Sequence, residues 1–473
     1  MEEIYPEPIE KQESIIRNVI FTPDFAKLFT GGTISLIGTS FGMIAGTFKI
    51  LAITDGMPVE QQAQILAFLS FFAIIPFIIL GPFSGIFVDS LNKKKLLIFA
   101  DIMGIIYSGG MYISSEIWHI YLATILATVS QSIVSPARGA TLPLIIKQEQ
   151  LVQANSYLKT GREFSMMIGP AMAGITIALF GLQIAFVIDG VTFFVSLVLV
   201  VMLKTDLSSV GANELNFRGV MTGLEKGFRL TVFDKIMAFI AFSLGFMVLA
   251  IAQINSIFPI YLVASYGLGE QDFGFIMAVS AASGFTAGIL LTMKKDIKNK
   301  LRFFMSGLLI TGMATVLLGV PQLLVYPRVS LYLGMALIGV TNIVVNVPLA
   351  TLLQSILNPG DIGKVSGFIN TLITMFQLVG VIIATQMVLF LPFDQIFIIS
   401  GVGVLIICLI GLGSISIFSL DDIANKRAED MAVIYQELMA RAKSQKVIEN
   451  SSSGQPLNSV ETSAESESKS LSG

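Results

Sequence analysis

The sequence predicts an all-α integral membrane protein with twelve transmembrane helices in two pseudo-symmetric six-helix halves. Composition is the first observation behind this fold class. Of the 473 residues, 54% are hydrophobic and only 13% are charged, whereas a soluble globular protein carries about 25% charged residues. The second observation is a series of long apolar runs, each near the roughly 20 residues that a transmembrane helix needs. Together they exclude a disordered protein, a nucleic-acid-binding protein and an ordinary soluble enzyme.

The apolar runs fall into two groups of six. The first group is predicted at residues 28–54, 64–88, 96–114, 118–143, 154–180 and 182–204. The second group is predicted at residues 234–263, 271–293, 302–320, 329–356, 364–391 and 393–419. Each run is continuously apolar and does not alternate over about ten residues, so the sequence predicts helices and not a transmembrane barrel.

These runs divide the chain into five predicted segments. They are a cytoplasmic N-terminal segment (1–27), a six-helix bundle (28–204), a cytoplasmic linker (205–233), a second six-helix bundle (234–419) and a cytoplasmic tail (420–473). In the linker, apolar residues recur at helical spacing among basic ones, which predicts an amphipathic helix on the inner membrane surface. The Ser- and Glu-rich end of the tail, residues 450–473, predicts disorder.

The basic residues predict the orientation in the membrane. All of the 29 Lys and Arg residues except Lys49 and Arg328 fall on one side of the predicted spans. Positively charged loops face the cytoplasm, and both termini lie on this basic side. We therefore expect a multi-pass protein of the plasma or inner membrane, with an even number of spans and both ends cytoplasmic.

Few residue types with catalytic or metal-binding chemistry are present. The only Cys and the only His, Cys408 and His119, are too few to assemble a Zn or Fe–S site. We find no phosphate-binding loop of the Gly-x4-Gly-Lys-[Ser/Thr] type, so ATP-driven transport by this chain is not expected. The formal net charge of −3 gives no basis for a nucleic-acid partner. The sequence predicts no enzyme, no catalytic residues, no metal and no cofactor.

Two matching passages indicate a duplication. Pro348 follows Pro136 by 212 residues, and Asp361 follows Glu149 by the same number. In each case the Pro lies in the C-terminal part of one span and the acidic residue precedes the next span. Two related six-helix halves place a binding site between them near the bilayer midplane, where alternating access operates.

The connection between the second and third spans carries a motif. A Gly and an Asp four residues later precede a basic cluster, in which the Gly allows close helix approach and the Asp accepts hydrogen bonds. Together with the six-plus-six organisation, this loop resembles the signature of the major facilitator superfamily, although Ser90 and Asn92 replace a usual basic residue and a Gly. The resemblance implies a conformational latch made by Gly85, Asp89, Lys93, Lys94 and Lys95.

A second motif lies in the fifth span. Gly169, Pro170 and Gly174 make a thin helix face suited to close packing, and they resemble the antiporter signature of the same superfamily. With Pro136-Ala137-Arg138, Pro143 and Gln153-Ala154-Asn155-Ser156, the chain is similar to the macrolide-efflux branch of drug exporters over residues 25–420. This resemblance implies export of amphiphilic small molecules, drug-like or macrolide, in exchange for protons.

Uncharged polar side chains near the middle of four spans are candidates for the substrate cavity. In the superfamily fold the helices in these positions line the central path, and an amide-lined cavity suits an amphiphilic compound. The alternative for each residue is a hydrogen bond between helices with no role in substrate binding. The candidates are Thr39, Gln131, Gln253, Asn255, Asn342 and Asn346.

Three ionisable residues within the spans are candidates for coupling transport to protons. Charged groups in the hydrocarbon core cost about 2.5–3.5 kcal/mol on insertion scales unless they face water or a partner, so Asp101, Asp189 and Lys49 call for an explanation. A structural role for each is the alternative. Many proton-coupled drug exporters carry an acid in the first span where this sequence has Thr39.

Other functions remain open at this point. A lysolipid or lipid transporter of the same fold predicts a side opening lined by apolar residues. A metabolite uptake permease predicts, for an anion, basic residues at the midplane. A non-transporting membrane sensor predicts no substrate flux. We expect a monomer embedded in the bilayer, with a small amphiphilic substrate and protons as its partners.

Overall fold

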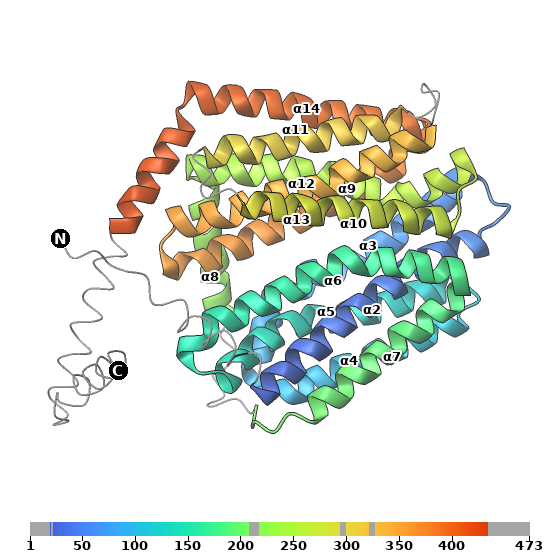
Figure 1. Ribbon diagram of the computed structural model, residues 1–473, viewed down its shortest axis with the longest axis horizontal. Helices are drawn as coiled ribbons and strands as arrows, with labels where there is room; N and C mark the ends of the chain where they lie inside the picture. The colour runs from blue at the N-terminus through green and yellow to red at the C-terminus, as the bar shows by residue number, and fades with distance from the viewer. Residues whose placement is uncertain (1–18, 20–21, 208–216, 294–298, 321–326, 434–473) are drawn as a thin grey trace, which may run out of the picture.

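A computed structural model describes residues 19, 22–207, 217–293, 299–320 and 327–433 (Figure 1). It contains twelve helices long and apolar enough to cross a membrane within these residues, as the sequence predicts. Part of the basic cluster after the eighth span and the Ser- and Glu-rich end of the tail lie outside the described residues.

The helices form two bundles joined by a linker helix. The first bundle holds α2 (Pro23–Ile53), α3 (Val59–Ser90), α4 (Lys93–Ile113), α5 (Ile117–Ile145), α6 (Leu151–Phe180) and α7 (Leu182–Val201). The second bundle holds α9 (Lys235–Tyr266), α10 (Glu270–Thr292), α11 (Lys300–Gly319), α12 (Pro327–Ile356), α13 (Pro359–Met387) and α14 (Phe393–Ile417). A short 3₁₀ turn, η1 (Gln148–Gln150), precedes α6, and the linker helix is α8 (Phe217–Val232).

The first helix begins earlier than the apolar pattern predicts. It starts at Pro23 instead of residue 28, with Thr22 at the N-cap and Asp24 in the first turn. Proline suits the first helical position because its missing N–H would have no partner there, and an acidic side chain interacts favourably with the helix dipole. These residues are polar or break the apolar pattern, so hydropathy places the start of the span after them. The predicted boundary after residue 27 therefore lies inside α2.

The two bundles repeat the same packing. The third helix of each half packs against the sixth, as α4 on α7 and α11 on α14. The second helix packs against the fourth, as α3 on α5 and α10 on α12. Figure 1 shows the two bundles side by side with their helices roughly aligned. The duplication inferred from the offset of 212 residues therefore corresponds to a structural repeat.

The hydrophobic core differs between the two sides of the molecule. We call the side where α2 begins and α14 ends the terminal side, and the other the opposite side. On the opposite side one continuous cluster, the joining core, unites both halves and includes Phe41, Phe48, Phe258 and Phe273. The rings of Phe48 and Phe273 meet edge to face at 5.4 Å between centroids.

On the terminal side each half has a core of its own. One cluster holds only residues of the second half and its flanking segments, such as Met305 and Leu352. Separate clusters serve the first half, including those around Leu97 and Leu142. Among the side chains that the structure describes, the halves therefore share one core on the opposite side and have separate cores on the terminal side.

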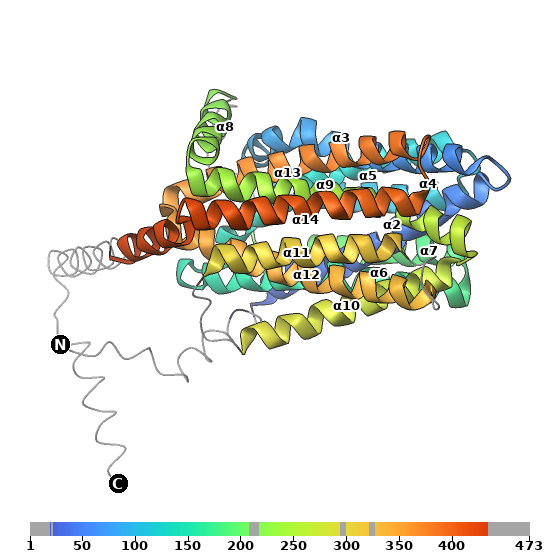
Figure 2. The ribbon, with the colours of Figure 1, turned by 90° about the horizontal axis from the view of Figure 1, so that it is seen from above.

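The linker helix α8 lies at the terminal side, where it stands out from the bundles in Figure 2. It packs on α13, with Lys226 Nζ 2.6 Å from Oδ1 of Asp361 and the ring of Phe228 against that of Phe368. Met221 on the same helix is 60% exposed. The helix expected in the linker is thus present, and its place on the membrane surface stays a prediction.

Candidate functional site

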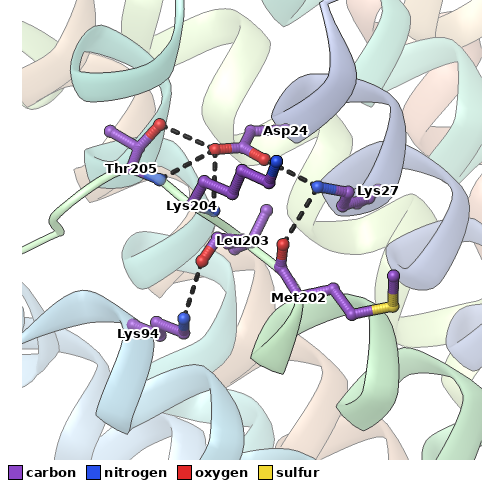
Figure 3. Close-up of polar contacts among 7 residues, drawn as sticks. All are labelled: Asp24, Lys27, Lys94, Met202, Leu203, Lys204 and Thr205. Atoms are coloured by element: carbon purple, nitrogen blue, oxygen red, sulfur yellow. Dashed lines mark hydrogen bonds and ion pairs between the residues drawn. The ribbon is translucent and has the colours of Figure 1, made fainter.

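Asp24 fastens the start of α2 to the segment after α7 (Figure 3). Its Oδ2 accepts hydrogen bonds from the backbone N–H groups of Lys204 and Thr205, at 3.0 and 2.9 Å, and from the Thr205 hydroxyl at 2.7 Å. Its Oδ1 lies 2.9 Å from Nζ of Lys27, which also donates to the carbonyl of Met202. Asp24 is only 8% exposed, so these partners compensate a nearly buried charge.

The second half has a related set of hydrogen bonds and ion pairs at the starts of its helices. Asp234 caps the N-terminus of α9, and its Oδ2 lies 2.7 Å from Nη1 of Arg427, which follows α14. Asp421 accepts a bond from the backbone of Leu301 at the start of α11 and pairs with Arg302 at 3.2 Å. Burial raises the pKa of Asp421, and these two partners oppose the shift. In both halves, therefore, the terminal-side end of the first helix is bonded to the segment after the sixth, and in the second half the start of the third helix is bonded to it as well.

Two lysines of the predicted latch also bond to the segment after α7. The backbone N–H of Lys93 donates to the carbonyl of Leu207 at 3.1 Å, and Nζ of Lys94 donates to that of Leu203 at 2.7 Å. Lys95 is exposed, and its N–H donates to the side chain of Asn92, the N-cap of α4. Gly85 and Asp89 belong to α3, but the structure describes neither the surroundings of Gly85 nor the side chain of Asp89. The latch itself therefore stays a prediction.

The antiporter-type motif lies on two contact faces of α6. A Cβ added at Gly169 would collide with the side chain of Ser40 on α2. One added at Gly174 would collide with the backbone of Gly274 on α10. Pro170 lies half-buried within the same helix. The motif therefore allows close packing on two faces of α6. At Gly169 the helix packs against α2 of its own bundle, and at Gly174 it packs against α10 of the other bundle.

The acids predicted for coupling lie between α4 and α7. Asp101 on α4 is 4% exposed, and its Oδ2 accepts a hydrogen bond from Ser196 at 3.0 Å. Asp189 on α7 is fully buried, with Oδ2 2.8 Å from the hydroxyl of Ser108 on α4. Its other oxygen, Oδ1, has no hydrogen-bond partner among the described residues. The two acids thus lie in the same helix interface with different partners.

Lys49, the third candidate, belongs to α2, and its side chain reaches the C-terminal end of α4. Its Nζ donates to the carbonyls of Met111 and Tyr112, at 2.6 and 3.1 Å, and stands 5.5 Å from the ring centroid of Phe186. A cation at a helix C-terminus satisfies its last carbonyls. This contact favours a structural role for Lys49.

Arg138 on α5 is a site residue that the sequence did not single out for coupling. Its Nη2 donates to the Ser35 hydroxyl on α2 at 3.2 Å. Gly32 adjoins the guanidinium, since an added Cβ there would stand 2.7 Å from Nη1. The charge of Arg138 acts on Asp101. The signal available in the sequence was an Arg near the end of an apolar run, and only the fold brings it toward an acid from another helix.

The cavity candidates divide by exposure. Gln253 is buried on α9, and its Oε1 accepts a hydrogen bond from Ser400 on α14, which favours an interhelical role. Thr39 is half-buried and donates to the carbonyl of Ser35 within α2. Gln131 on α5 is half-buried, and Asn255 on α9 is exposed.

Asn342 and Asn346 form a polar patch on α12. Both are exposed, and Nδ2 of Asn346 donates to Oδ1 of Asn342 at 3.0 Å. Leu333, which is 53% exposed, lies about 180° away around the helix at 100° per residue. In a membrane an apolar exposed face suits lipid, whereas exposed amides require water or a polar ligand. The asparagine face of α12 is therefore the strongest candidate for a wall of the substrate path.

Comparison with known proteins decides the family. Residues 25–380 match the sequence profile of the Major Facilitator Superfamily. The chain belongs to this superfamily. As a member of this superfamily with twelve apolar helices, it is a multi-pass membrane transporter for a small-molecule substrate and not an enzyme, which confirms the sequence interpretation.

Two bacterial relatives match most of the chain. An uncharacterised transporter of this type, YfiS of Bacillus subtilis, is 26% identical over 360 residues, 75% of this chain and 84% of the relative. Macrolide efflux protein A of Streptococcus pyogenes is 20% identical over 398 residues, 81% of this chain and 94% of the relative.

Solved structures support the superfamily fold. A bacterial homologue of the iron transporter ferroportin in an inward-facing state matches 82% of this chain and 98% of its own, with a TM-score of 0.60 and 17% identity. The nucleoside transporter NupG matches 82% of this chain and 99% of its own, with a TM-score of 0.65 and 14% identity. At these identities the similarity concerns the fold alone.

Proposed function

We propose that this protein exports amphiphilic small molecules, such as macrolides, from the cell in exchange for protons. The observation that carries the proposal is the exposed pair Asn342 and Asn346, opposite the apolar face of α12. An uncharged amide surface hydrogen-bonds a neutral or weakly charged compound and leaves its apolar part to neighbouring side chains. Among the described residues, the only Lys, Arg, Asp or Glu of α12 is Arg328, which lies on the same exposed arc but in the first turn of the helix, so α12 places no charge directly beside the amide pair.

The packing of the two halves supports export by alternating access. With the terminal side in the cytoplasm, as the Lys and Arg distribution predicts, the separate terminal-side cores and the joining core correspond to a conformation that receives substrate from the cytoplasm. The similarity to macrolide efflux protein A over 81% of the chain supports the same direction and substrate class.

The proposal is tested in everted membrane vesicles that contain the protein. We expect radiolabelled erythromycin, a macrolide, to accumulate in the vesicles when their interior is made acidic, and a protonophore to abolish the accumulation. Vesicles from cells that lack the protein provide the control. Accumulation that persists after every ion gradient has collapsed would contradict proton exchange, and an absence of transport for macrolides and amphiphilic dyes alike would contradict the substrate class.

Asn342→Ala is expected to change substrate preference. Loss of a hydrogen bond at the binding surface weakens binding by about 0.5–1.5 kcal/mol, so KM for macrolides with a matching hydroxyl should rise more than KM for an apolar dye. Leu333→Ala, on the lipid-facing arc of the same helix, is the matched control. Equal effects of both variants on the two substrates would remove Asn342 from the path.

A further inference from the structure

Two Asp–Ser pairs join α4 to α7 at different depths. In one pair α4 supplies Asp101 and α7 supplies Ser196. In the other pair α4 supplies Ser108 and α7 supplies Asp189. Each residue lies seven positions from its counterpart on the same helix, which is about two helical turns. The protein therefore contains the same chemical pair twice, with the helices exchanged, and the two copies can be compared directly.

Counting hydrogens separates the two pairs. The Ser108 hydroxyl lies 2.8 Å from Oδ2 of Asp189 and 2.9 Å from the carbonyl oxygen of Gly104. A hydroxyl has one hydrogen to donate, and a carbonyl oxygen has none. With an ionised Asp189, the single Ser108 hydrogen is shared between the two acceptors, whereas a proton on Oδ2 of Asp189 would let Ser108 donate fully to Gly104 and accept from Asp189.

The other pair needs no such proton. Among the described residues, the Ser196 hydroxyl has a single acceptor, Oδ2 of Asp101. The charge of Arg138 also acts on Asp101. An ionised carboxylate at Asp101 is therefore compatible with all of its contacts.

The charged and titratable groups around Asp189 do not compensate an ionised carboxylate. From α4 it faces Tyr107 and, two turns away, Asp101. On α2 the cation of Lys49 is engaged by the carbonyls at the end of α4. The charged residues of α6 are Lys159, Arg162 and Glu163, all in its terminal-side half. In the part of the chain that the structure describes, no ion pair includes Asp189.

The α2 helix connects Asp189 with the contact between the halves. Gly42 faces the carboxyl group, since an added Cβ there would stand 2.5 Å from Oδ2. The neighbouring Phe41 is 2% exposed and belongs to the joining core. A charged Asp189 would lie directly against α2 at Gly42. Another face of α2 carries Phe41, which packs in the joining core between the two halves. Because an uncompensated buried charge costs several kcal/mol, ionisation favours a movement of α2 that admits water.

We propose that Asp189 is the proton carrier of the transport cycle and that its neutral form holds α2 in place while the joining core is closed. This proposal rests on the proton exchange proposed above. When the carrier discharges, the O–H bond of the carboxylic acid breaks and the proton passes to water on the terminal side. The carboxylate that remains favours opening of the opposite side, where it takes up a proton from water after substrate has left.

The transport test compares accumulation with binding in Asp189→Asn. Each pH unit is worth about 1.4 kcal/mol, so a gradient of about two units sustains up to about 100-fold accumulation in one-for-one exchange. We expect the erythromycin accumulation driven by this gradient to be at least about tenfold lower in the variant. Its Kd for erythromycin should change by less than about twofold. Accumulation within about twofold of the natural protein would overturn the proposal.

An infrared measurement tests the buried proton without a substrate. We expect the natural protein at neutral pH to show a C=O stretching band of a protonated carboxyl group that Asp189→Asn removes and Asp101→Asn leaves. If Asp189→Asn does not fold, Ser108→Ala serves instead, and the band should shift because its hydrogen-bond acceptor is lost. A band that none of these variants affects would overturn the proposal. A natural protein that ignores the pH gradient but shows the band would contradict the proton exchange of the proposed function, not the buried proton.

Discussion

Gly174→Val is expected to abolish most transport. The glycine on α6 meets the backbone of Gly274 on α10, and any added Cβ would collide with backbone atoms that cannot move to a new rotamer. Overpacking of this kind costs about 1–3 kcal/mol or more. The closed arrangement of the opposite side would lose that free energy, and 1–3 kcal/mol corresponds to roughly a 5- to 150-fold change in a conformational equilibrium.

Two measurements follow this effect. Erythromycin efflux should fall by at least about tenfold, within the range that this free energy allows. In a Cys408→Ser background that also carries Phe48→Cys, the thiol introduced into the joining core should become accessible to a membrane-impermeant maleimide when Gly174→Val is added. Phe48 is 3% exposed in the closed arrangement.

A matched glycine controls for the substitution itself. Gly109 on α4 has no neighbour within 4 Å of an added Cβ, so Gly109→Val should leave efflux and maleimide labelling close to those of the natural protein. Full efflux by Gly174→Val, with no maleimide labelling of the thiol introduced by Phe48→Cys, would show that this glycine contact does not govern closure of the opposite side.

The sequence predicts the helices well because the bilayer imposes a simple requirement on each of them. A span must be apolar over about 20 residues and must satisfy its own backbone, so all twelve helices were visible as apolar runs. Gly174 was also visible, because a motif marked it, although its partner Gly274 was not. The helix start at Pro23 shows where hydropathy alone is misleading, since polar capping signals extend a helix beyond its apolar part.

The site could be predicted only as a set of residue types. Asp101 and Asp189 were conspicuous because charge is rare in the spans, but their serine partners lie on other helices and have no sequence signal of their own. Gln253 shows the opposite difficulty. Its amide suited a cavity, whereas the fold pairs it with Ser400 inside the second bundle. Spacing along one helix does not reveal which neighbour each face meets.

Arg138→Met is expected to destabilise the first bundle, and a second substitution should reverse much of the loss. Removing the cation leaves the nearly buried carboxylate of Asp101 without the charge that acts on it. No ion pair within 4 Å joins these two side chains among the described residues, so the loss should be smaller than the about 3–5 kcal/mol of a broken buried salt bridge, and replacing both partners by neutral groups is often close to neutral. The free energy of unfolding in mixed detergent should therefore fall in Arg138→Met and recover in Arg138→Met/Asp101→Asn.

Ser35→Ala separates this charge effect from the hydrogen bond of Arg138. The Ser35 hydroxyl accepts from Nη2 at 3.2 Å, and its loss should cost no more than about 0.5–1.5 kcal/mol. If the double variant is no more stable than Arg138→Met, the two charges do not compensate each other, and Asp101 would then need a proton as Asp189 does. The stability of the double variant therefore also tests whether Asp101 is ionised while Asp189 is protonated. If Asp101 is ionised, Asp101→Asn should raise the free energy of unfolding of Arg138→Met; if Asp101 is protonated, it should not.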